Sequence, residues 1–245
     1  MEPFVIDPPM RLAHLRVPHT TPYSHASVLQ DRLVQRLLAS KANPSHSSSL
    51  PPPDPTIITA QFHPVYTCGR REVGTLSQEQ IDYLRDDGRA EFVEAMRGGQ
   101  TTFHGPGQLV AYPVIDLKRH ALSPRCYVRL LEDTLIATCK RYWIRGFTTE
   151  NPGVWTSEGT KIAALGVHLR RNVTSHGIGL NVRTDLWWFN RIVACGLEGK
   201  ETTSFEREGV NGIGVEEVGE VFVKEFAKGL GVEETYRIEE HEVNS

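Results

Sequence analysis

The sequence predicts an α+β fold, with packed helices on a mixed or antiparallel sheet, in a single domain over residues 10–230. Three long amphipathic segments, at 24–40, 123–143 and 214–230, have the length and apolar spacing of helices. Strand-like segments instead follow one another directly between residues 153 and 182. A doubly wound α/β protein would alternate strands with helices, so this order favours the α+β class.

Capping residues predict where the helices begin and end. Ser24 is expected to cap the first long helix, whose leucines recur on one face. Ser123 precedes Pro124 at the first turn of the second, where the missing proline N–H costs nothing. The last helix carries a stripe of valine and phenylalanine, and Gly229 is expected near its C-cap. A shorter helix at 77–87 begins with a Ser-x-x-Gln capping box.

Four segments predict the sheet. Residues 56–62 are β-branched and bounded by prolines, as is typical of a strand. Residues 109–115 read as a buried strand that we expect Pro113 to interrupt. Residues 153–171 predict two strands joined by a tight turn, and 173–182 predict a third strand directly after them.

Two segments are expected to lie outside the packed core. Residues 41–56 are rich in serine and proline, and they predict a disordered surface insertion within the domain. Residues 232–245 are acidic and polar, and they predict a tail that frays.

Composition argues against several classes of function. The 245 residues carry 27 Lys and Arg against 30 Asp and Glu, which gives no basic surface for nucleic acid or an anionic membrane. No apolar run approaches the roughly 20 residues of a membrane span. The first residues are acidic, which argues against a secretory signal or an arginine-rich transit peptide. The cysteines (Cys68, Cys126, Cys139 and Cys195) form no Cys-x-x-Cys pair, so we expect reduced thiols and no zinc site.

The most informative segment is RGGQTTFHGPGQ, residues 97–108, called here the glycine-rich stretch. Its glycines allow backbone N–H groups to approach a ligand closely, and Arg97 and His104 can bind an anionic or polar group. The stretch lacks the Gly-Lys-Ser/Thr of a Walker A loop and the spacing of a dinucleotide loop. By itself it fits either a ligand cradle or a cluster of tight turns with a surface histidine.

Other positions are candidates for chemistry. Lys161 begins an apolar strand, where a buried ammonium needs a partner and can stabilise a thiolate. Cys195 precedes a glycine in a polar loop whose N–H groups could hold an oxyanion, and Cys68, which also precedes a glycine, is the rival nucleophile. In SHGIGLNV, Gly177 and Gly179 indicate either close approach by a ligand or a β-bulge.

Together and in this order, the segments RGGQTTFHGPGQLVAYPVIDL, NPGVW, KIAALGVHLRR, SHGIGLNV and ACG resemble the lipoyl(octanoyl) transferase family, in its eukaryotic form. The resemblance implies the fold of the catalytic domains of biotin and lipoate protein ligases. It also implies an acyltransferase that moves an octanoyl (or lipoyl) group from acyl carrier protein to an enzyme cysteine, and then to a specific lysine of a lipoyl domain. This is the first step of endogenous lipoate synthesis on proteins.

The resemblance also implies residue roles. By position in the motifs, Cys195 matches the acyl-accepting cysteine and Lys161 matches the lysine that lowers its pKa. Three segments match the acyl-substrate-binding residues: Arg97, Gly98, Gly99, Gln100, Thr101, Thr102, Phe103 and His104, then Ala164, Leu165 and Gly166, then Gly177, Ile178 and Gly179. Ala194, Phe103 and Gly179 stand where the family more often has proline, tyrosine and alanine.

The family implies no metal, no ATP and no resident cofactor, because the phosphopantetheine arrives on the acyl carrier protein. The implied partners are octanoyl-acyl carrier protein, the lipoyl domains of 2-oxoacid dehydrogenase complexes and the glycine cleavage H protein, and the implied location is mitochondrial. Two alternatives stay open. An adenylating lipoate or biotin ligase of the same fold would need ATP but no nucleophilic cysteine, and a non-catalytic protein that sequesters an acylated carrier would bind without turnover.

Overall fold

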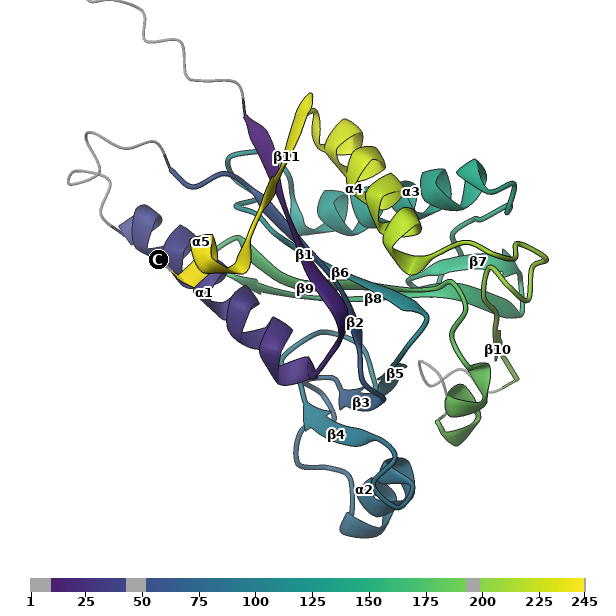
Figure 1. The fold of residues 1–245 in the computed structure, drawn as a ribbon. Helices are drawn as coiled ribbons and strands as arrows, with labels where there is room; N and C mark the ends of the chain where they lie inside the picture. The colour runs from purple at the N-terminus through teal and green to yellow at the C-terminus, as the bar shows by residue number, and fades with distance from the viewer. Residues whose placement is uncertain (1–9, 43–51, 193–198, 245) are drawn as a thin grey trace, which may run out of the picture.

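The computed structural model describes residues 10–42, 52–192 and 199–244. Its centre is a large sheet in the order β10-β8-β9-β6-β2-β1-β11, with β7 paired to β8 (Figure 1). Its strands are β1 (Arg11–Thr21), β2 (Thr56–Phe62), β6 (Gln108–Val114), β7 (Val154–Ser157), β8 (Thr160–Arg170), β9 (Val173–Asn181), β10 (Glu201–Thr202) and β11 (Glu234–Ile238). Pairs β1–β2, β1–β11 and β8–β10 are parallel and the other pairs are antiparallel, so the predicted mixed sheet is confirmed.

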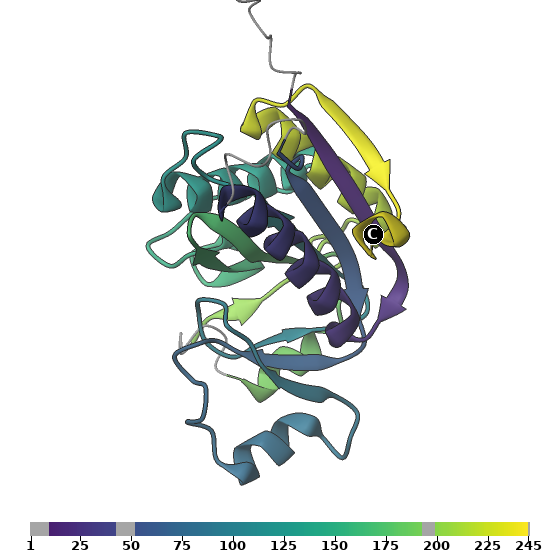
Figure 2. The same ribbon diagram turned by 90° about the vertical axis from the view of Figure 1, so that its left-hand side faces the viewer.

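Helices cover both faces of this sheet. One face carries α1 (Tyr23–Ala42) and α5 (Glu240–Asn244), and the other carries α3 (Pro124–Arg141) and α4 (Val215–Leu230) (Figure 1). A second sheet, in the order β4-β3-β5, consists of β3 (Val65–Cys68), β4 (Glu91–Glu94) and β5 (Thr102–His104). Figure 2 shows this small sheet and α2 (Gln78–Arg85) at one end of the large sheet, beyond the end of α1. The 3₁₀ helix η1 (Leu186–Arg191) contacts β5.

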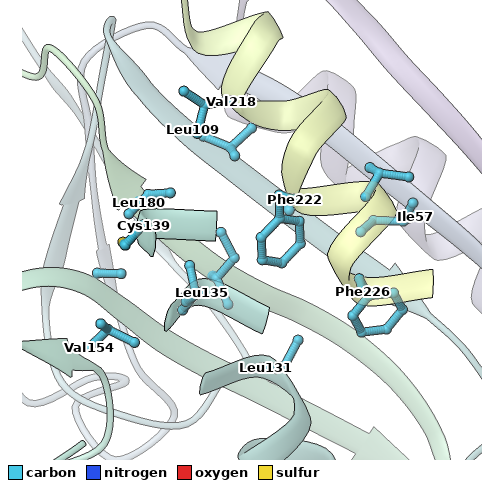
Figure 3. Packing of buried hydrophobic residues seen from close by; sticks show 14 of the residues in the cluster. Ile57, Leu109, Leu131, Leu135, Cys139, Val154, Leu180, Val218, Phe222 and Phe226 are labelled. Carbon is cyan, nitrogen blue, oxygen red and sulfur yellow. The ribbon is translucent and has the colours of Figure 1, made fainter. Parts of the chain in front are cut away.

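The larger apolar core lies between the sheet, α3 and α4. Figure 3 shows Phe222 and Phe226 of α4 among side chains of α3 and of strands β2 and β6, and both rings are fully buried. Truncating a buried phenylalanine to alanine typically costs about 3–5 kcal/mol. This layer therefore fixes β6, β8 and β9, which are the strands that carry the candidate site.

The predicted strands are largely confirmed, and one expectation is wrong. Strands β7, β8 and β9 follow one another as predicted. Strand β6, however, continues through Pro113 to Val114, where we expected an interruption. The β6–β9 ladder ends at Ala111, so Pro113 pairs with a neighbouring strand on the β2 side alone, opposite Ile57. Proline is tolerated where one side of a strand needs no N–H donor.

The predicted cap of the first helix is wrong, and the predicted end of the last helix is confirmed. The first helix begins at Tyr23, so Ser24 lies in its first turn and is not the cap; the carbonyl of Pro22 already accepts a hydrogen bond from the N–H of His25. The last helix ends at Leu230, as predicted. Its C-cap is Gly231, whose φ of +75° is the left-handed conformation that glycine favours, and Gly229 lies two residues before this cap. The capping serine of α3 and the capping box of α2 are confirmed.

The prediction of a frayed tail is wrong. Residues 234–238 form β11 at the edge of the large sheet, parallel to β1, and α5 follows with Val243 buried against α1. Tyr236 donates a hydrogen bond from its hydroxyl to Asp54 (2.9 Å), and Arg237 pairs with Glu220 (2.6 Å). Most of the strand's side chains are exposed and only Tyr236 and Ile238 are half-buried, as on an edge strand, and composition alone does not distinguish this from fraying.

Other elements were not predicted. Strands β1, β3, β4 and β5 have no counterpart among the strands predicted from the sequence. Of the predicted insertion, residues 41–42 belong to α1 and Thr56 begins β2, while 43–51 lie outside the described residues.

Candidate active site

One pocket gathers most of the residues singled out in the sequence. It lies where the glycine-rich stretch faces the middle of β8 and β9, and we call it the central pocket. Its lining residues are Arg97, Gly99, Gln100, Thr102, His104, Tyr112, Ala164, Leu165, Gly166, His176, Gly177, Ile178 and Gly179. Eleven of the fourteen residues predicted to bind the acyl substrate therefore line a single pocket.

The strands β8 and β9 form a wall with little side-chain volume. Cross-strand pairs place Ala164 beside Gly179 and Gly166 beside Gly177. A Cβ on Gly179 would lie 3.2 Å from the Gln108 side-chain oxygen, and a Cβ on Gly177 would lie 2.1 Å from the Ala111 carbonyl oxygen. Larger residues would therefore fill the pocket or separate the strands, so the wall consists mainly of backbone.

The glycine-rich stretch is fastened to this wall by backbone contacts. The N–H of Gly98 donates to the carbonyl of Val167 on β8 (3.0 Å), and the N–H of Arg70 donates to the carbonyl of Arg97 (2.9 Å). A Cβ on Gly166 would lie 2.7 Å from the Gly98 carbonyl oxygen, and one on Gly69 would lie 1.8 Å from that of Gly99. Gly69 was not predicted to matter, yet its missing side chain allows the stretch to approach.

The guanidinium of Arg97 also holds the glycine-rich stretch in place. Its Nη2 donates to the Thr67 carbonyl (2.5 Å) and to the Thr67 hydroxyl (2.8 Å), and its Nη1 donates to the Gly98 carbonyl (2.9 Å). The side chain is buried and also lines the central pocket. Arg97 thus ties β3 to the glycine-rich stretch while placing a fixed positive charge at the pocket wall.

His104 stands at the head of a buried polar chain. Gln108 donates from its Nε2 to the Phe103 carbonyl (3.2 Å) and to Asn181 Oδ1 (2.9 Å), so its Oε1 accepts from His104 Nδ1 (2.6 Å). Asn181 in turn donates to the Thr203 carbonyl (3.0 Å). The pKa of His104 is lowered to about 4, mainly because the ring is buried and secondly because the positive charge of Arg97 lies nearby. The ring is therefore neutral at neutral pH, and its Nε2 is left as an acceptor.

Two lining residues, Tyr112 and His176, were not predicted as site residues. Their rings meet edge to face with centroids 5.5 Å apart. His176 is 7% exposed and adopts a φ of +57°, and its N–H donates to Oε1 of Gln30 on α1 (2.5 Å). His176 was visible in the HGIG segment, but the left-handed backbone that marks it has no signal in the sequence.

Lys161 is buried at the start of β8, outside the central pocket's lining. Its ammonium donates to the Pro152 carbonyl (2.9 Å) and lies 4.6 Å from the centroid of the Trp155 ring. A Cβ on Gly153 would lie 3.1 Å from Lys161 Cε, and the Gly153 N–H donates to Glu132 Oε1 (3.1 Å). The NPGVW segment therefore folds around the lysine and fixes it three residues before Ala164.

Cys195 lies outside the described residues, as do Ala194 and Gly196. The chain that follows them returns to Lys161: Thr202 of β10 pairs with Lys161, and the N–H of Thr203 donates to the Lys161 carbonyl (2.9 Å).

The described cysteines are poor candidates for a thiolate at the pocket. Cys68 is fully buried, and burial raises the pKa of its thiol. Burial also raises the pKa of Cys139, to about 12. Hydrogen bonding with Ser123 lowers the pKa of Cys126, but this exposed thiol lies on the first turn of α3 and does not line the central pocket. Since the thiolate is the nucleophile, these surroundings argue against the rival Cys68.

Three residues predicted to bind substrate do not line the central pocket. Phe103 points away from His104 on the same short strand, as strand geometry requires, and stacks on Trp188 with centroids 5.1 Å apart. Thr101 is bonded through its hydroxyl to Glu72 (2.8 Å), and Gly98 faces β8. These residues hold the stretch in place without lining the pocket.

Comparison with known proteins identifies the family. Residues 23–227 match the lipoyl protein ligase A/B catalytic domain. The chain belongs to this family. It is 56% identical to "Probable octanoyltransferase" of Schizosaccharomyces pombe over 77% of this chain and 82% of that protein. It is 39% identical to the human mitochondrial octanoyl-acyl-carrier-protein:protein N-octanoyltransferase over 89% of this chain and 92% of that protein.

The fold agrees with solved members of the family. A bipartite lipoate protein ligase from Thermoplasma acidophilum superimposes with a TM-score of 0.66 and 15% identity, covering 96% of this chain and 90% of that one. The predicted α+β ligase-like fold is therefore confirmed. Within the described ranges, no group of three or more His, Cys, Asp or Glu side chains is placed to hold a metal. No helix among the described residues has the length and apolar character to cross a membrane.

Proposed function

We propose that this chain is an octanoyltransferase that acts in mitochondria, taking an octanoyl group from acyl carrier protein and delivering it to a lysine of a lipoyl domain. Several relatives that match most of its length are named octanoyltransferases, and some of these are mitochondrial. The observation that carries the proposal is the convergence of three separate sequence segments on one pocket with a backbone wall. Such a wall suits a thin, flexible acyl chain, since burial of each CH₂ contributes about 0.8 kcal/mol.

We assign the covalent step to Cys195. Its thiolate attacks the octanoyl carbonyl carbon, a new C–S bond forms, and the carrier's C–S bond breaks, so that the pantetheine thiolate leaves and takes up a proton. In the second step a lysine amine attacks the acyl-Cys195 carbonyl. The amide C–N bond forms, the C–S bond to Cys195 breaks, and the amine proton passes to the departing sulfur or to water.

Lys161 is the group that we assign to favouring the thiolate. It is buried and fixed by Pro152, Gly153 and Trp155, and the chain after Cys195 returns to it at Thr202. A nearby ammonium stabilises a thiolate and raises its population at neutral pH. His104, held neutral with its Nε2 as an acceptor, lines the pocket and can receive a hydrogen bond from the reacting groups.

The test separates this reaction from that of an adenylating ligase and from sequestration. The protein is incubated with a lipoyl domain and octanoyl-acyl carrier protein, without ATP, and the domain is followed by intact mass. We expect many octanoylated domains per enzyme, none in Cys195→Ala, and none from free octanoate with ATP. Product from octanoate and ATP alone would instead indicate a ligase, and a yield limited to one per protein would indicate a binding protein.

A further inference from the structure

The strand register orders the wall of the central pocket from one end to the other. Along β8 and β9 the facing pairs run from Ala164 and Gly179, through Leu165 and Ile178 and then Gly166 and Gly177, to Val167 and His176. Lys161 precedes Ala164 on β8, so it belongs to the first end. His176 stands at the opposite end, and Tyr112 lies against it.

The length of this wall matches one particular acyl chain. Three residues of strand span about 10 Å, which is the distance along β8 from Ala164 to Val167. An extended chain of eight carbons, with seven bonds of about 1.5 Å in a zigzag, spans about 9 Å. By the same measure a chain of ten carbons spans about 11 Å, which exceeds the length of this wall.

The ring of His176 is built into this end of the pocket. His176 adopts a φ of +57°, a left-handed conformation that is uncommon for a non-glycine residue, and it does so inside strand β9. The buried amide of Gln30 accepts the His176 N–H, and Tyr112 packs against the ring. Within the described part of the chain, His176 Nδ1 has no hydrogen-bond partner, although the residue is 7% exposed. Burial, followed by the Arg97 charge, lowers the pKa of this histidine to about 3, so the ring is neutral.

We propose that His176, backed by Tyr112 and held by Gln30, closes the far end of the central pocket and sets the acyl-chain length at about eight carbons. The inference rests on the proposed function, because it takes the thioester head to lie toward Lys161. His176 is thus a residue that determines specificity, and it takes no part in the bond changes.

The decisive variant is His176→Gly, because glycine accepts the left-handed backbone while removing the ring. Rates of acyl loading are compared for hexanoyl, octanoyl, decanoyl and dodecanoyl carrier protein. We expect the ratio of dodecanoyl to octanoyl loading to rise at least tenfold, and to rise less in His176→Asn, whose side chain is shorter but still present. The control that should keep the parent's profile is His168→Gly on β8, which lies outside the pocket lining.

A second measurement keeps this idea separate from the proposed reaction. Stabilisation against heat by free fatty acids of six to twelve carbons reports pocket length without any transfer step. We expect the optimum to lie near eight carbons in the parent and to move to longer acids in His176→Gly. Failure of every protein to transfer acyl groups would overturn the proposed function alone. An unchanged dependence on acyl-chain length in a folded His176→Gly, in both assays, would overturn the proposal that His176 closes the far end of the pocket.

Discussion

Replacing Gly166 with alanine adds one methyl group at the closest contact between β8 and the glycine-rich stretch. That methyl would lie 2.7 Å from the carbonyl oxygen of Gly98 and 3.2 Å from Arg97 Cδ. Ordinary contacts begin near 3.4 Å, so the stretch must retreat from β8 by about 0.7 Å. The retreat strains the hydrogen bond from Gly98 to Val167 and shifts Arg97, both of which hold the stretch at the pocket wall.

Overpacking of this kind costs about 1–3 kcal/mol of folding free energy. For a chain of this size each kcal/mol lowers the thermal midpoint by about 2–4 °C. Displacement of a binding segment by about 1 Å can cost as much as 100-fold in rate, so we expect acyl loading to slow by roughly 10- to 100-fold. The rate is measured by rapid quenching and intact mass.

The matched control is Gly159→Ala, in the turn before β8. A Cβ there meets nothing closer than 4.0 Å, so stability and loading should stay at the parent values. If Gly166→Ala loads acyl groups as fast as the parent, the contact between β8 and the glycine-rich stretch does not shape the pocket, and our reasoning about its backbone wall is wrong.

Three further predictions follow from the same contacts. In a protein whose other cysteines are replaced, Lys161→Met should slow alkylation of Cys195 by a small electrophile at neutral pH by at least about tenfold. Equal alkylation rates would show that Lys161 does not stabilise the Cys195 thiolate. Gln108→Leu should lower the free energy of unfolding by about 3 kcal/mol in chemical denaturation, because His104 Nδ1, Asn181 Oδ1 and the Phe103 carbonyl each lose their hydrogen bond to Gln108. A loss under about 1 kcal/mol would contradict the role of this buried hydrogen-bond chain. Because the pKa of His104 is lowered to about 4, the unfolded chain takes up a proton on this histidine below about pH 6.5, whereas the folded chain takes it up only near pH 4. The free energy of unfolding should therefore fall as the pH drops through this window, by up to about 3 kcal/mol from this residue. His104→Gln should show a shallower fall, and an equal fall would refute the assignment.

Much of the fold is predictable from local signals, because capping residues and apolar periodicity act within a few residues. The helix at Ser123 and the strands between 153 and 182 are confirmed for this reason. Strand β11 was missed because its stability comes from pairing with β1, more than 200 residues earlier, and not from its own acidic sequence.

Part of the site is likewise predictable from the sequence, and part depends on tertiary contacts. The glycines of the 97–108 stretch indicate that a ligand or another backbone approaches it closely. The resemblance to the family identifies the residues of β8 and β9 that line the same pocket. The sequence does not reveal which face each side chain takes, so Phe103 was placed with the substrate although it stacks on Trp188 and does not line the pocket. Gly69 and the left-handed His176 are tertiary features, since the first depends on the Gly99 carbonyl and the second on Gln30.

The most direct test is the site of the acyl group on the enzyme itself. The protein is mixed with octanoyl-acyl carrier protein in the absence of an acceptor, and its intact mass and peptides are measured. We predict a single octanoyl adduct on Cys195, labile to hydroxylamine, absent in Cys195→Ala and retained when Cys68, Cys126 and Cys139 are each replaced by alanine. An octanoyl adduct that persists in Cys195→Ala, or that maps to Cys68, would contradict the assignment of the covalent step.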